Sequence, residues 1–385
     1  MDFQFSQEQE AFRATAREFA QRRLVPGYRE RCASGKLEPE LVREMGEMGL
    51  INVLLPEAYG GLGLDCVTAG LICEEIARGD LNAAYLPLLH HLMGQIVLDN
   101  GTEEQKAHWL PKMCSGEALM ALALTEPHAG SDAAQISLKA EKEGENWKLT
   151  GEKTSISMAD QAHCGVVFAR TGQKEDGAQG ISAFLVPMDL PGISRSRFDD
   201  AGTLSVGRGS IFFDGVTVPN SAMLGSEGKG FVQVMHGFDF SRALIGLMVI
   251  GVAAASLEDT WRYAQERTAF GSPLVRNEGV SFPLAEAETK LEAARLLCYK
   301  TLWLKDQGLP HAAEAAMCKW WGPQLAFEVL HQCVLLHGHA GYSNDYPHQM
   351  RMRDVMGLEI GDGTAQIMKI IIAREKAGRI AVPYK

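Results

Sequence analysis

The residues best placed to carry chemistry lie near the end of the chain, where Asp362 stands between Gly361 and Gly363. Glycines allow positive φ angles and a close approach of the backbone to a ligand. The amphipathic run 365–379 predicts a helix, whose first peptide N–H groups would favour a carboxylate in front of them. Such a carboxylate can act as a base in a cleft. For this stretch alone, Asp362 or Thr364 as a plain helix N-cap is the simpler interpretation.

Composition limits the class of protein. The chain has 385 residues, which predicts two or three packed subdomains. It is 46% hydrophobic and 22% charged, as is ordinary for a soluble globular protein. The net charge of −11 argues against nucleic acid and anionic membranes as partners. A local basic site for a phosphorylated ligand is compatible with this charge.

Cysteine usage and hydropathy indicate the compartment. The eight cysteines are scattered without a Cys-x-x-Cys pair, which is typical of free thiols in a reducing compartment. The first residues lack a basic segment followed by an apolar one, so we expect no signal peptide. The longest nearly apolar run, 243–257, is shorter than the ~20 residues that span a bilayer. We expect a cytoplasmic protein with no membrane contact and no metal site.

Residues 1–120 predict an N-terminal helical domain. Ser6 and Gln9 fit a capping box, and an apolar helical face follows them. Further helices are expected at 39–48, 66–78, 81–99 and 103–115, with a glycine-rich loop at 56–63.

Residues 121–230 predict a middle β-domain. Turn clusters, among them Asp214-Gly215, separate short β-prone runs. Strands are expected at 118–124, 146–150, 165–170, 181–186, 210–213 and 216–218. Because no long helices intervene, we expect an antiparallel, barrel-like sheet rather than a parallel βαβ sheet. This excludes a Rossmann dinucleotide site, and no P-loop motif is present.

Residues 231–385 predict a C-terminal four-helix bundle. The long helical segments are expected at 242–267, 284–301, 311–336 and 365–379, with connections of modest length. The expected fold is therefore mainly α with a central β-domain.

A set of short motifs resembles, in the same order and over essentially the whole chain, those of the acyl-CoA dehydrogenase family. They are Pro56-Glu-Ala-Tyr-Gly-Gly61, Leu124-Thr-Glu-Pro-His-Ala-Gly-Ser-Asp132, Leu149-Thr-Gly-Glu-Lys153, Val216-Thr-Val-Pro219, Leu224-Gly-Ser-Glu-Gly-Lys-Gly-Phe231, Glu266-Arg-Thr-Ala-Phe-Gly271 and the stretch around Asp362. The resemblance implies the same succession of helical domain, β-domain and four-helix bundle that periodicity predicts.

The resemblance implies FAD-dependent α,β-dehydrogenation of an acyl-CoA. A base removes the α-proton, the β-hydrogen leaves as hydride to flavin N5, and electron-transferring flavoprotein reoxidises the flavin. The enolate must be stabilised in a dry site, in this family by the backbone N–H of the base residue and a ribityl hydroxyl of FAD. A homotetramer is also implied.

Asp362 matches the family's base position, where glutamate is usual. The missing methylene retracts the carboxylate by ~1.5 Å if the backbone stays in place, a distance that matters for rate. Some family members carry the base just before the arginine that matches Arg242, but this position is Ser241 here. His90 and His91 match the segment that lines the acyl pocket in relatives, and we expect each to be structural or part of the pocket wall.

Two positions near the base are smaller than in many relatives. Gly361 stands where tyrosine is frequent, and Ser155 stands where a bulky aromatic commonly covers the flavin. Together with the shorter base, these residues predict a pocket widened for an α-branched or ring acyl group. The alternative is that neighbouring side chains, such as Phe282 or Trp320, fill the space.

Ligand-binding residues follow from the same resemblance. The positions expected at FAD are Leu124, Thr125, Ser131, Ser155 and Ser157 near the isoalloxazine, Arg267 and Phe270 across a subunit interface, His339 at the pyrophosphate, and Thr364 and Gln366 near the adenosine. Glu278 and Leu335 depart from family glutamines, and His339 from a family glycine. The positions expected at the acyl-CoA are His91, Asp239, Ser241, Arg242, Gly361 and Gly363, with ordinary ion pairing as the alternative for Asp239 and Arg242.

The stretch 360–368 is most similar to cyclohexanecarboxyl-CoA dehydrogenases. We therefore expect conversion of cyclohexane-1-carbonyl-CoA to cyclohex-1-ene-1-carbonyl-CoA, as in alicyclic acid degradation, with a short or α-branched acyl-CoA as the nearest alternative. Two hypotheses from other classes are a nitroalkane-oxidase-like flavin oxidase, which also uses an aspartate base, and a noncatalytic flavin or acyl-CoA binding homologue.

Overall fold

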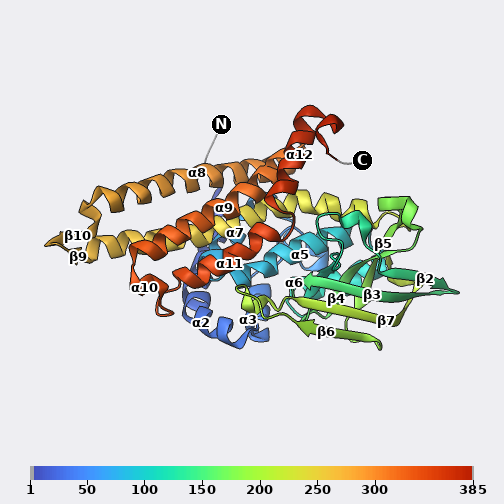
Figure 1. Ribbon diagram of the computed structural model, residues 1–385. Helices are drawn as coiled ribbons and strands as arrows, with labels where there is room; N and C mark the ends of the chain where they lie inside the picture. The colour runs from blue at the N-terminus through green and yellow to red at the C-terminus, as the bar shows by residue number, and fades with distance from the viewer. Residues whose placement is uncertain (1–3, 384–385) are drawn as a thin grey trace.

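The computed structural model, which describes residues 4–383, has helices at both ends of the sequence and a β-sheet between them in the sequence, and the sheet lies at the right end of the view (Figure 1). The N-terminal helices are α1 (Gln7–Phe19), α2 (Val25–Ser34), α3 (Pro39–Glu47), α4 (Cys66–Gly79), α5 (Leu81–Asn100) and α6 (Glu103–Cys114). All four helices expected after residue 38 are confirmed to within one residue at each end. The capping box is also confirmed, since Ser6 Oγ accepts from Gln9 N–H and the Gln9 side chain accepts from Ser6 N–H.

The central sheet has eight strands in the order β6-β7-β3-β2-β4-β5-β8, with β1 paired to β4. The strands are β1 (Met120–Ala123), β2 (Lys139–Glu143), β3 (Asn146–Ile156), β4 (Cys164–Arg170), β5 (Ile181–Pro187), β6 (Ile193–Arg197), β7 (Gly209–Pro219) and β8 (Met223–Leu224). The sheet is antiparallel except where β1 and the start of β2 pair with β4. The expected antiparallel sheet is confirmed apart from these pairs. Because the β2–β3 hairpin is inserted between β1 and β4, the chain returns to β4 in the direction of β1.

Two local expectations about strands are corrected. The runs 210–213 and 216–218 form one strand, β7, and Asp214-Gly215 lies inside it rather than in a turn between strands. Gly215 takes a φ of 61° next to a register shift against β3, which is the geometry of a bulge. Strands β2 and β6 were not expected, because their sequences are mostly polar and exposed.

The C-terminal part is organised around α7 (Gly230–Glu266), a helix of 37 residues. The other elements are the hairpin β9 (Thr268–Ala269) and β10 (Ser272–Pro273), then α8 (Glu278–Asp306), α9 (Ala312–Leu336), α10 (His339–Tyr342), α11 (His348–Ile360) and α12 (Ala365–Ala377). The four expected long segments correspond to α7, α8, α9 and α12, whereas α11 was not expected. Helix α7 is long and apolar enough to cross a membrane by composition, but 94% of its most apolar window is buried inside the protein.

Helix α7 is buried because it packs against α4, α5, α8 and α9. At its crossing with α9, a β-carbon on Gly322 would lie 3.1 Å from the Cα of Gly246. Glycine at this crossing lets the two backbones approach each other directly, so any side chain there would push the helices apart.

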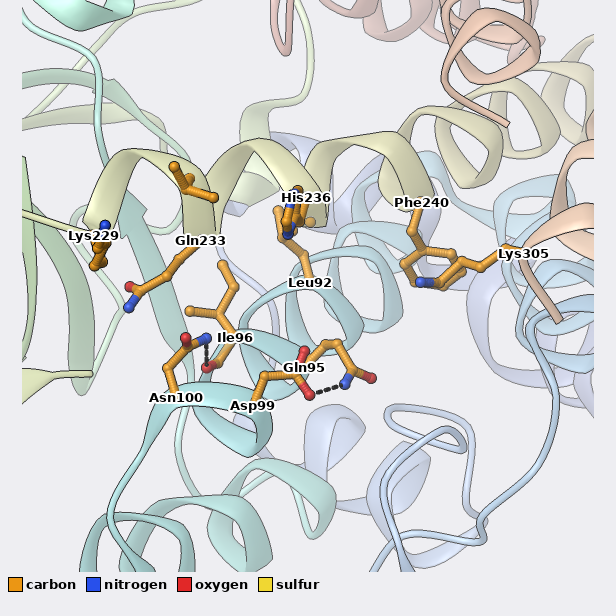
Figure 2. Close-up of a pocket in the computed structure, with 12 residues that line it drawn as sticks. Leu92, Gln95, Ile96, Asp99, Asn100, Lys229, Gln233, His236, Phe240 and Lys305 are labelled. Carbon is orange, nitrogen blue, oxygen red and sulfur yellow. Dashed lines mark hydrogen bonds between the residues drawn. The ribbon is translucent and has the colours of Figure 1, made fainter. Parts of the chain in front are cut away.

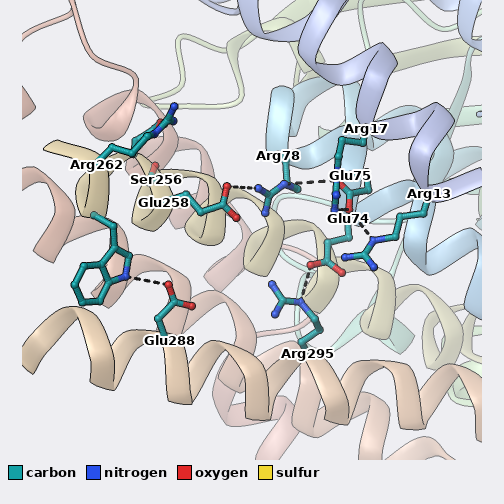
Figure 3. A network of polar contacts seen from close by, with 12 residues as sticks. Arg13, Arg17, Glu74, Glu75, Arg78, Ser256, Glu258, Arg262, Glu288 and Arg295 are labelled. Atoms are coloured by element: carbon teal, nitrogen blue, oxygen red, sulfur yellow. Dashed lines mark hydrogen bonds and ion pairs between the residues drawn. The ribbon is translucent and has the colours of Figure 1, made fainter. Parts of the chain in front are cut away.

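Ion pairs connect α4 to its helical neighbours (Figure 3). On one side Glu75 binds Arg17 and Arg13 of α1 at 2.6 and 3.0 Å, and on the other Glu74 binds Arg295 of α8 at 2.7 Å. Burial alone would raise the pKa of Glu75, but the hydrogen bonds from Arg17 and Arg13 hold this pKa below its ordinary value. The N-terminal helices are thereby fixed to the C-terminal bundle.

Asp354 of α11 joins all three parts of the chain. Its carboxylate accepts hydrogen bonds from Tyr28 Oη at 2.6 Å, from Asn82 Nδ2 at 2.9 Å and from the peptide N–H of Thr203. Tyr28 and Asn82 belong to the N-terminal helices, and Thr203 belongs to the loop between β6 and β7. Burial raises the pKa of Asp354 to about 6. We call this cluster of four residues the Asp354 junction.

The Asp354 junction leads to a prediction about stability. Asp354→Ala is expected to lower the free energy of unfolding by about 3 kcal/mol, since three buried donors lose their common acceptor. Tyr28→Phe, which removes one donor only, is expected to cost about 1 kcal/mol. Urea unfolding of the cofactor-loaded protein measures both values, and equal costs for the two variants would contradict a shared acceptor.

Candidate active site

Asp362 lies in the turn between α11 and α12. Asp362 and Gly363 take positive φ angles of 56° and 102°, whereas Gly361 is extended with a φ of −63°. The expectation of positive φ is therefore confirmed for Gly363 and wrong for Gly361, because the aspartate itself takes the left-handed conformation, which Asp tolerates better than most residues. A β-carbon on Gly363 would lie 2.5 Å from Met368 Cε, so the turn needs glycine there.

The carboxylate of Asp362 is free of local hydrogen bonds. Thr364 is the N-cap of α12, since its hydroxyl accepts from the peptide N–H of Ile367 at 3.4 Å. Asp362 receives no hydrogen bond from any described residue. The helix-cap interpretation therefore applies to Thr364 and not to Asp362, whose carboxylate remains available for chemistry.

Lys319 of α9 holds the turn between α11 and α12 in place. The side chain is 1% exposed, and its Nζ donates to the carbonyl oxygens of Leu358 at 2.6 Å and Gly363 at 3.1 Å. Burial lowers the pKa of Lys319 to about 8, and the charge of Asp362 opposes this shift. Sequence reasoning missed Lys319, although a lysine inside the apolar stretch 315–321 of α9 is a signal that could have singled it out.

Arg242 presents a second cation to the site. It is 6% exposed on α7, and its guanidinium binds Asp239 at 2.8 Å, while its Nε has no hydrogen-bond partner in the described part of the chain. Burial lowers the pKa of Arg242, and the charges of Asp239 and Asp362 act in the opposite direction. Ser241 is buried and donates to the carbonyl of Phe238, so the position before Arg242 offers no acid. Asp362 thus lies in the field of Arg242 and Lys319.

The two histidines of α5 have structural partners. His91 Nε2 accepts a hydrogen bond from the peptide N–H of Val53 at 3.1 Å, and its ring contacts Phe240 edge-on. His90 lies between the carbonyl oxygens of Leu86 and Ala118. Burial lowers the pKa of both rings, that of His91 to about 3, so both are neutral at ordinary pH. These contacts fix the loop around Val53 and give neither ring a polar contact with Asp362.

A buried ion pair explains two of the sequence motifs. Lys153 Nζ lies 2.7 Å from Glu126 Oε1 and donates to the carbonyl of Leu124 at 2.9 Å. Glu126 also accepts from the peptide N–H groups of Ser137 and Leu138. Burial lowers the pKa of Lys153 to about 8, whereas the charge of Lys153 holds the pKa of Glu126 below its ordinary value against the effect of burial. The pair fixes the segment after β1 on strand β3.

The segment held in this way has free donors for a ligand. The carbonyl of Thr125 accepts from Thr154 N–H at 2.9 Å, whereas the peptide N–H groups of Thr125 and Ser157 find no partner among the described residues. Ser155 sits beside them in a register shift of β3, with a positive φ of 56° and an exposed side chain. Ser131 is exposed on the same loop. Free N–H groups next to small hydroxyl residues fit the polar edge of a flavin ring.

The remaining expected cofactor residues lie far from this segment. Arg267 and Phe270 belong to the β9–β10 hairpin and its approach, and His339 begins α10. These elements lie at the left end of the molecule in Figure 1, and the sheet lies at the right end. Phe270 is fully exposed with a positive φ of 51°. Within one chain, these residues and the sheet therefore do not form one site. Thr364 and exposed Gln366 lie at the start of α12.

A separate cavity of about 330 Å³ lies between α5, the first half of α7 and the end of α8 (Figure 2). Among its lining residues are Ile96, His236, Phe240 and Lys305. None of Asp362, Arg242 and Lys319 lines it. We place the candidate active site at Asp362, where charge and free hydrogen-bonding groups gather, and not in this cavity.

Comparisons with known proteins agree with this geometry. Three family models match the chain in succession: the N-terminal domain of acyl-CoA dehydrogenase at 6–117, the middle domain at 121–216 and the C-terminal domain at 228–377. A probable acyl-CoA dehydrogenase of Bacillus subtilis, YngJ, is 34% identical over 97% of this chain and 99% of its own.

Two solved structures extend the comparison. Butyryl-CoA dehydrogenase from Megasphaera elsdenii is 32% identical with a TM-score of 0.94, over 98% of this chain and 100% of that one. The FAD complex of PigA is 26% identical with a TM-score of 0.94 and the same coverage. The chain belongs to the acyl-CoA dehydrogenase family.

Proposed function

We propose that the protein dehydrogenates an acyl-CoA thioester at its α,β-bond with Asp362 as the base. Membership of the family makes the protein an oxidoreductase with FAD as its cofactor. The observation that carries the assignment of the base is the free carboxylate of Asp362, held on a rigid left-handed turn between two buried cations. A carboxylate with a merely structural role would be hydrogen-bonded, as Glu126 is.

Each group around Asp362 has a task in this reaction. Asp362 removes the α-proton, and its own peptide N–H, which has no partner among the described residues, is available to the thioester oxygen as negative charge develops there. Lys319 keeps the turn in place by binding the carbonyl of Gly363, and Arg242 adds a second buried cation near the site. The peptide N–H groups of Thr125 and Ser157 would hold FAD, which would supply the oxidant for the β-hydride. Electron-transferring flavoprotein is the proposed acceptor of the electrons.

We propose cyclohexane-1-carbonyl-CoA as the substrate, with short or α-branched acyl-CoA as the alternative. The side chains that could have filled the space left by Gly361 and Ser155 are engaged elsewhere. Phe282 is largely exposed on α8, and the ring of Trp320 is covered by Lys369 at 4.5 Å. A side chain at Gly361 would meet only ordinary contacts, so the open space there is not forced by the backbone. This supports a pocket wide enough for a ring.

A homo-oligomer, which we propose to be a tetramer, would complete the cofactor site. Phe270 is fully exposed on the β9–β10 hairpin, and Figure 1 shows this hairpin and α10, which begins with His339, at the same end of the molecule. A second copy placed against this end would bring these residues to the FAD held by the sheet of the first. An exposed aromatic at a strained φ angle is explained by such a contact and not by the monomer.

The substrate proposal is tested by anaerobic addition of acyl-CoA thioesters to the oxidised protein. Loss of flavin absorbance is expected with cyclohexane-1-carbonyl-CoA at a rate at least about tenfold above that with octanoyl-CoA, because a widened pocket leaves a straight chain poorly positioned. Isobutyryl- and butyryl-CoA test the alternative. Reduction of the flavin by straight-chain thioesters alone would refute the widened pocket. Rapid reoxidation of the reduced flavin in air, together with a substrate that carries no CoA, would favour an oxidase.

The role of Asp362 is tested by Asp362→Asn, which keeps the shape and suits the left-handed turn equally well. FAD is expected to stay bound with its spectrum intact, while flavin reduction by acyl-CoA falls by at least about a thousandfold, since the amide cannot accept the α-proton. Asp239→Asn is the matched control and is expected to alter thioester affinity more than the rate of reduction. Retained reduction in Asp362→Asn would assign the base to another residue.

The oligomer proposal is tested by Phe270→Asp. A charged side chain in the proposed contact is expected to shift the protein toward a monomer in analytical ultracentrifugation and to release FAD on gel filtration. Phe282→Asp introduces the same charge on another exposed aromatic and controls for a loss of solubility. An unchanged oligomer with full FAD content in Phe270→Asp would contradict a cofactor site shared between copies.

A further inference from the structure

Tyr85 of α5 carries a buried hydroxyl that the protein leaves unsatisfied. The side chain is 2% exposed, and its Oη has no hydrogen-bond partner among the described residues. Other enclosed tyrosines are paired with acids: Tyr28 donates to Asp354 and Tyr299 donates to Glu74, each at 2.6 Å. A buried polar group without a partner is uncommon in a folded protein and calls for a functional explanation.

The hydroxyl lies beside the candidate active site. Asn82, one turn before Tyr85 on the same face of α5, donates to Asp354. Arg208 approaches α11 one turn after Asp354, where its NH1 is 3.7 Å from the place of a β-carbon on Gly357. Apart from burial, which raises the pKa of Tyr85 to about 12, the groups that act on this phenol are, in order, Arg208, Asp362 and Asp354. Tyr85 therefore faces the second half of α11, the helix that leads into the turn of Asp362.

The charged groups around Tyr85 limit which kind of ligand atom can accept a hydrogen bond from its hydroxyl. The guanidinium of Arg208 is already neutralised by Asp200 at 3.3 Å, and it lies near the phenol oxygen. Because a guanidinium can only donate, it leaves the O–H of Tyr85 without an acceptor. Among the described residues, another unpaired side-chain group near Asp362 is Arg242 Nε, which can only donate. A carboxylate on the substrate would find no unpaired cation at Tyr85 and would lie in the field of Asp362 and Asp354. A neutral oxygen, which can accept from the phenol, fits this surrounding.

We propose that Tyr85 is a specificity-determining residue that hydrogen-bonds a neutral oxygen atom, a hydroxyl or a ketone, on the acyl group of the substrate. The inference rests on the proposed function and narrows its substrate class to ring acyl-CoA thioesters that carry an oxygen substituent. A site that reserves a buried hydroxyl for a substrate oxygen discriminates strongly against the analogue without it, because the hydroxyl then stays unpaired.

The test uses thioesters that bind without reacting. Benzoyl-CoA has no α-proton, so its affinity for the FAD-loaded protein is a binding readout independent of catalysis. We expect 3-hydroxybenzoyl-CoA or 4-hydroxybenzoyl-CoA to bind at least about tenfold more tightly than benzoyl-CoA. In Tyr85→Phe this preference is expected to disappear, while benzoyl-CoA binds within about threefold of its affinity for the unaltered protein. Titration by the change in flavin absorbance measures all these affinities.

Tyr299→Phe is the matched control, because it removes an enclosed phenol oxygen far from Asp362. It is expected to keep the preference for the hydroxylated ring and to lower the unfolding temperature, since Glu74 loses a donor. Tyr85→Phe is expected to unfold at the same temperature as the unaltered protein or a higher one, because it removes an unpaired polar group.

Three outcomes would overturn the inference. They are equal affinities for benzoyl-CoA and both hydroxybenzoyl-CoA thioesters in the unaltered protein, a preference that survives in Tyr85→Phe, and tighter Tyr85-dependent binding of 4-carboxybenzoyl-CoA than of either hydroxylated ring. Failure of the proposed function would give a different experimental result. In that case no acyl-CoA reduces the flavin, whether or not the binding preference for a hydroxylated ring is present.

Discussion

The position of the base depends on a carboxylate that takes no part in the chemistry. Asp354 accepts from an N-terminal helix residue, Tyr28, from Asn82 on the neighbouring α5, and from Thr203 next to the sheet. Asp362 follows Asp354 by six residues of helix, roughly 9 Å of rise, and a short turn, so residues from three parts of the chain help to locate it. Lys319 of α9 then fixes the C-terminal end of α11 by donating to the carbonyl of Leu358.

Glu126 and Asp362 differ in how many hydrogen bonds their carboxylates accept from the protein. Glu126 accepts three hydrogen bonds and an ion pair with Lys153, and this saturation makes it a rigid support for the loop after β1. Asp362 has cations nearby but receives no hydrogen bond from residues 4–383. The difference in function follows from this difference in surroundings, because a carboxylate committed to the protein cannot easily accept a substrate proton. The same reasoning separates Tyr85 from the paired Tyr28.

Most of the helical architecture could be predicted from the sequence, because long, mainly apolar segments such as those of α7 and α9 indicate buried helices. The polar strands β2 and β6 and the helix α11 could not, since their place depends on partners elsewhere in the chain, such as the Asp354 junction. For the site, the sequence motifs singled out Asp362 and Arg242. Lys319 and Tyr85 were missed, because their meaning comes from contacts with α11, more than thirty residues away in the chain.

The separation of Phe270 and His339 from the sheet has a genetic consequence. If two copies assemble as proposed, each catalytic centre draws its base from one polypeptide and part of its cofactor cradle from the neighbour. A chain damaged at Asp362 and a chain damaged at Phe270 could then restore one intact centre when they are produced together. The same arrangement would let a single defective allele impair the product of a healthy one in mixed assemblies, so the unit on which selection acts is the pair of chains rather than the chain.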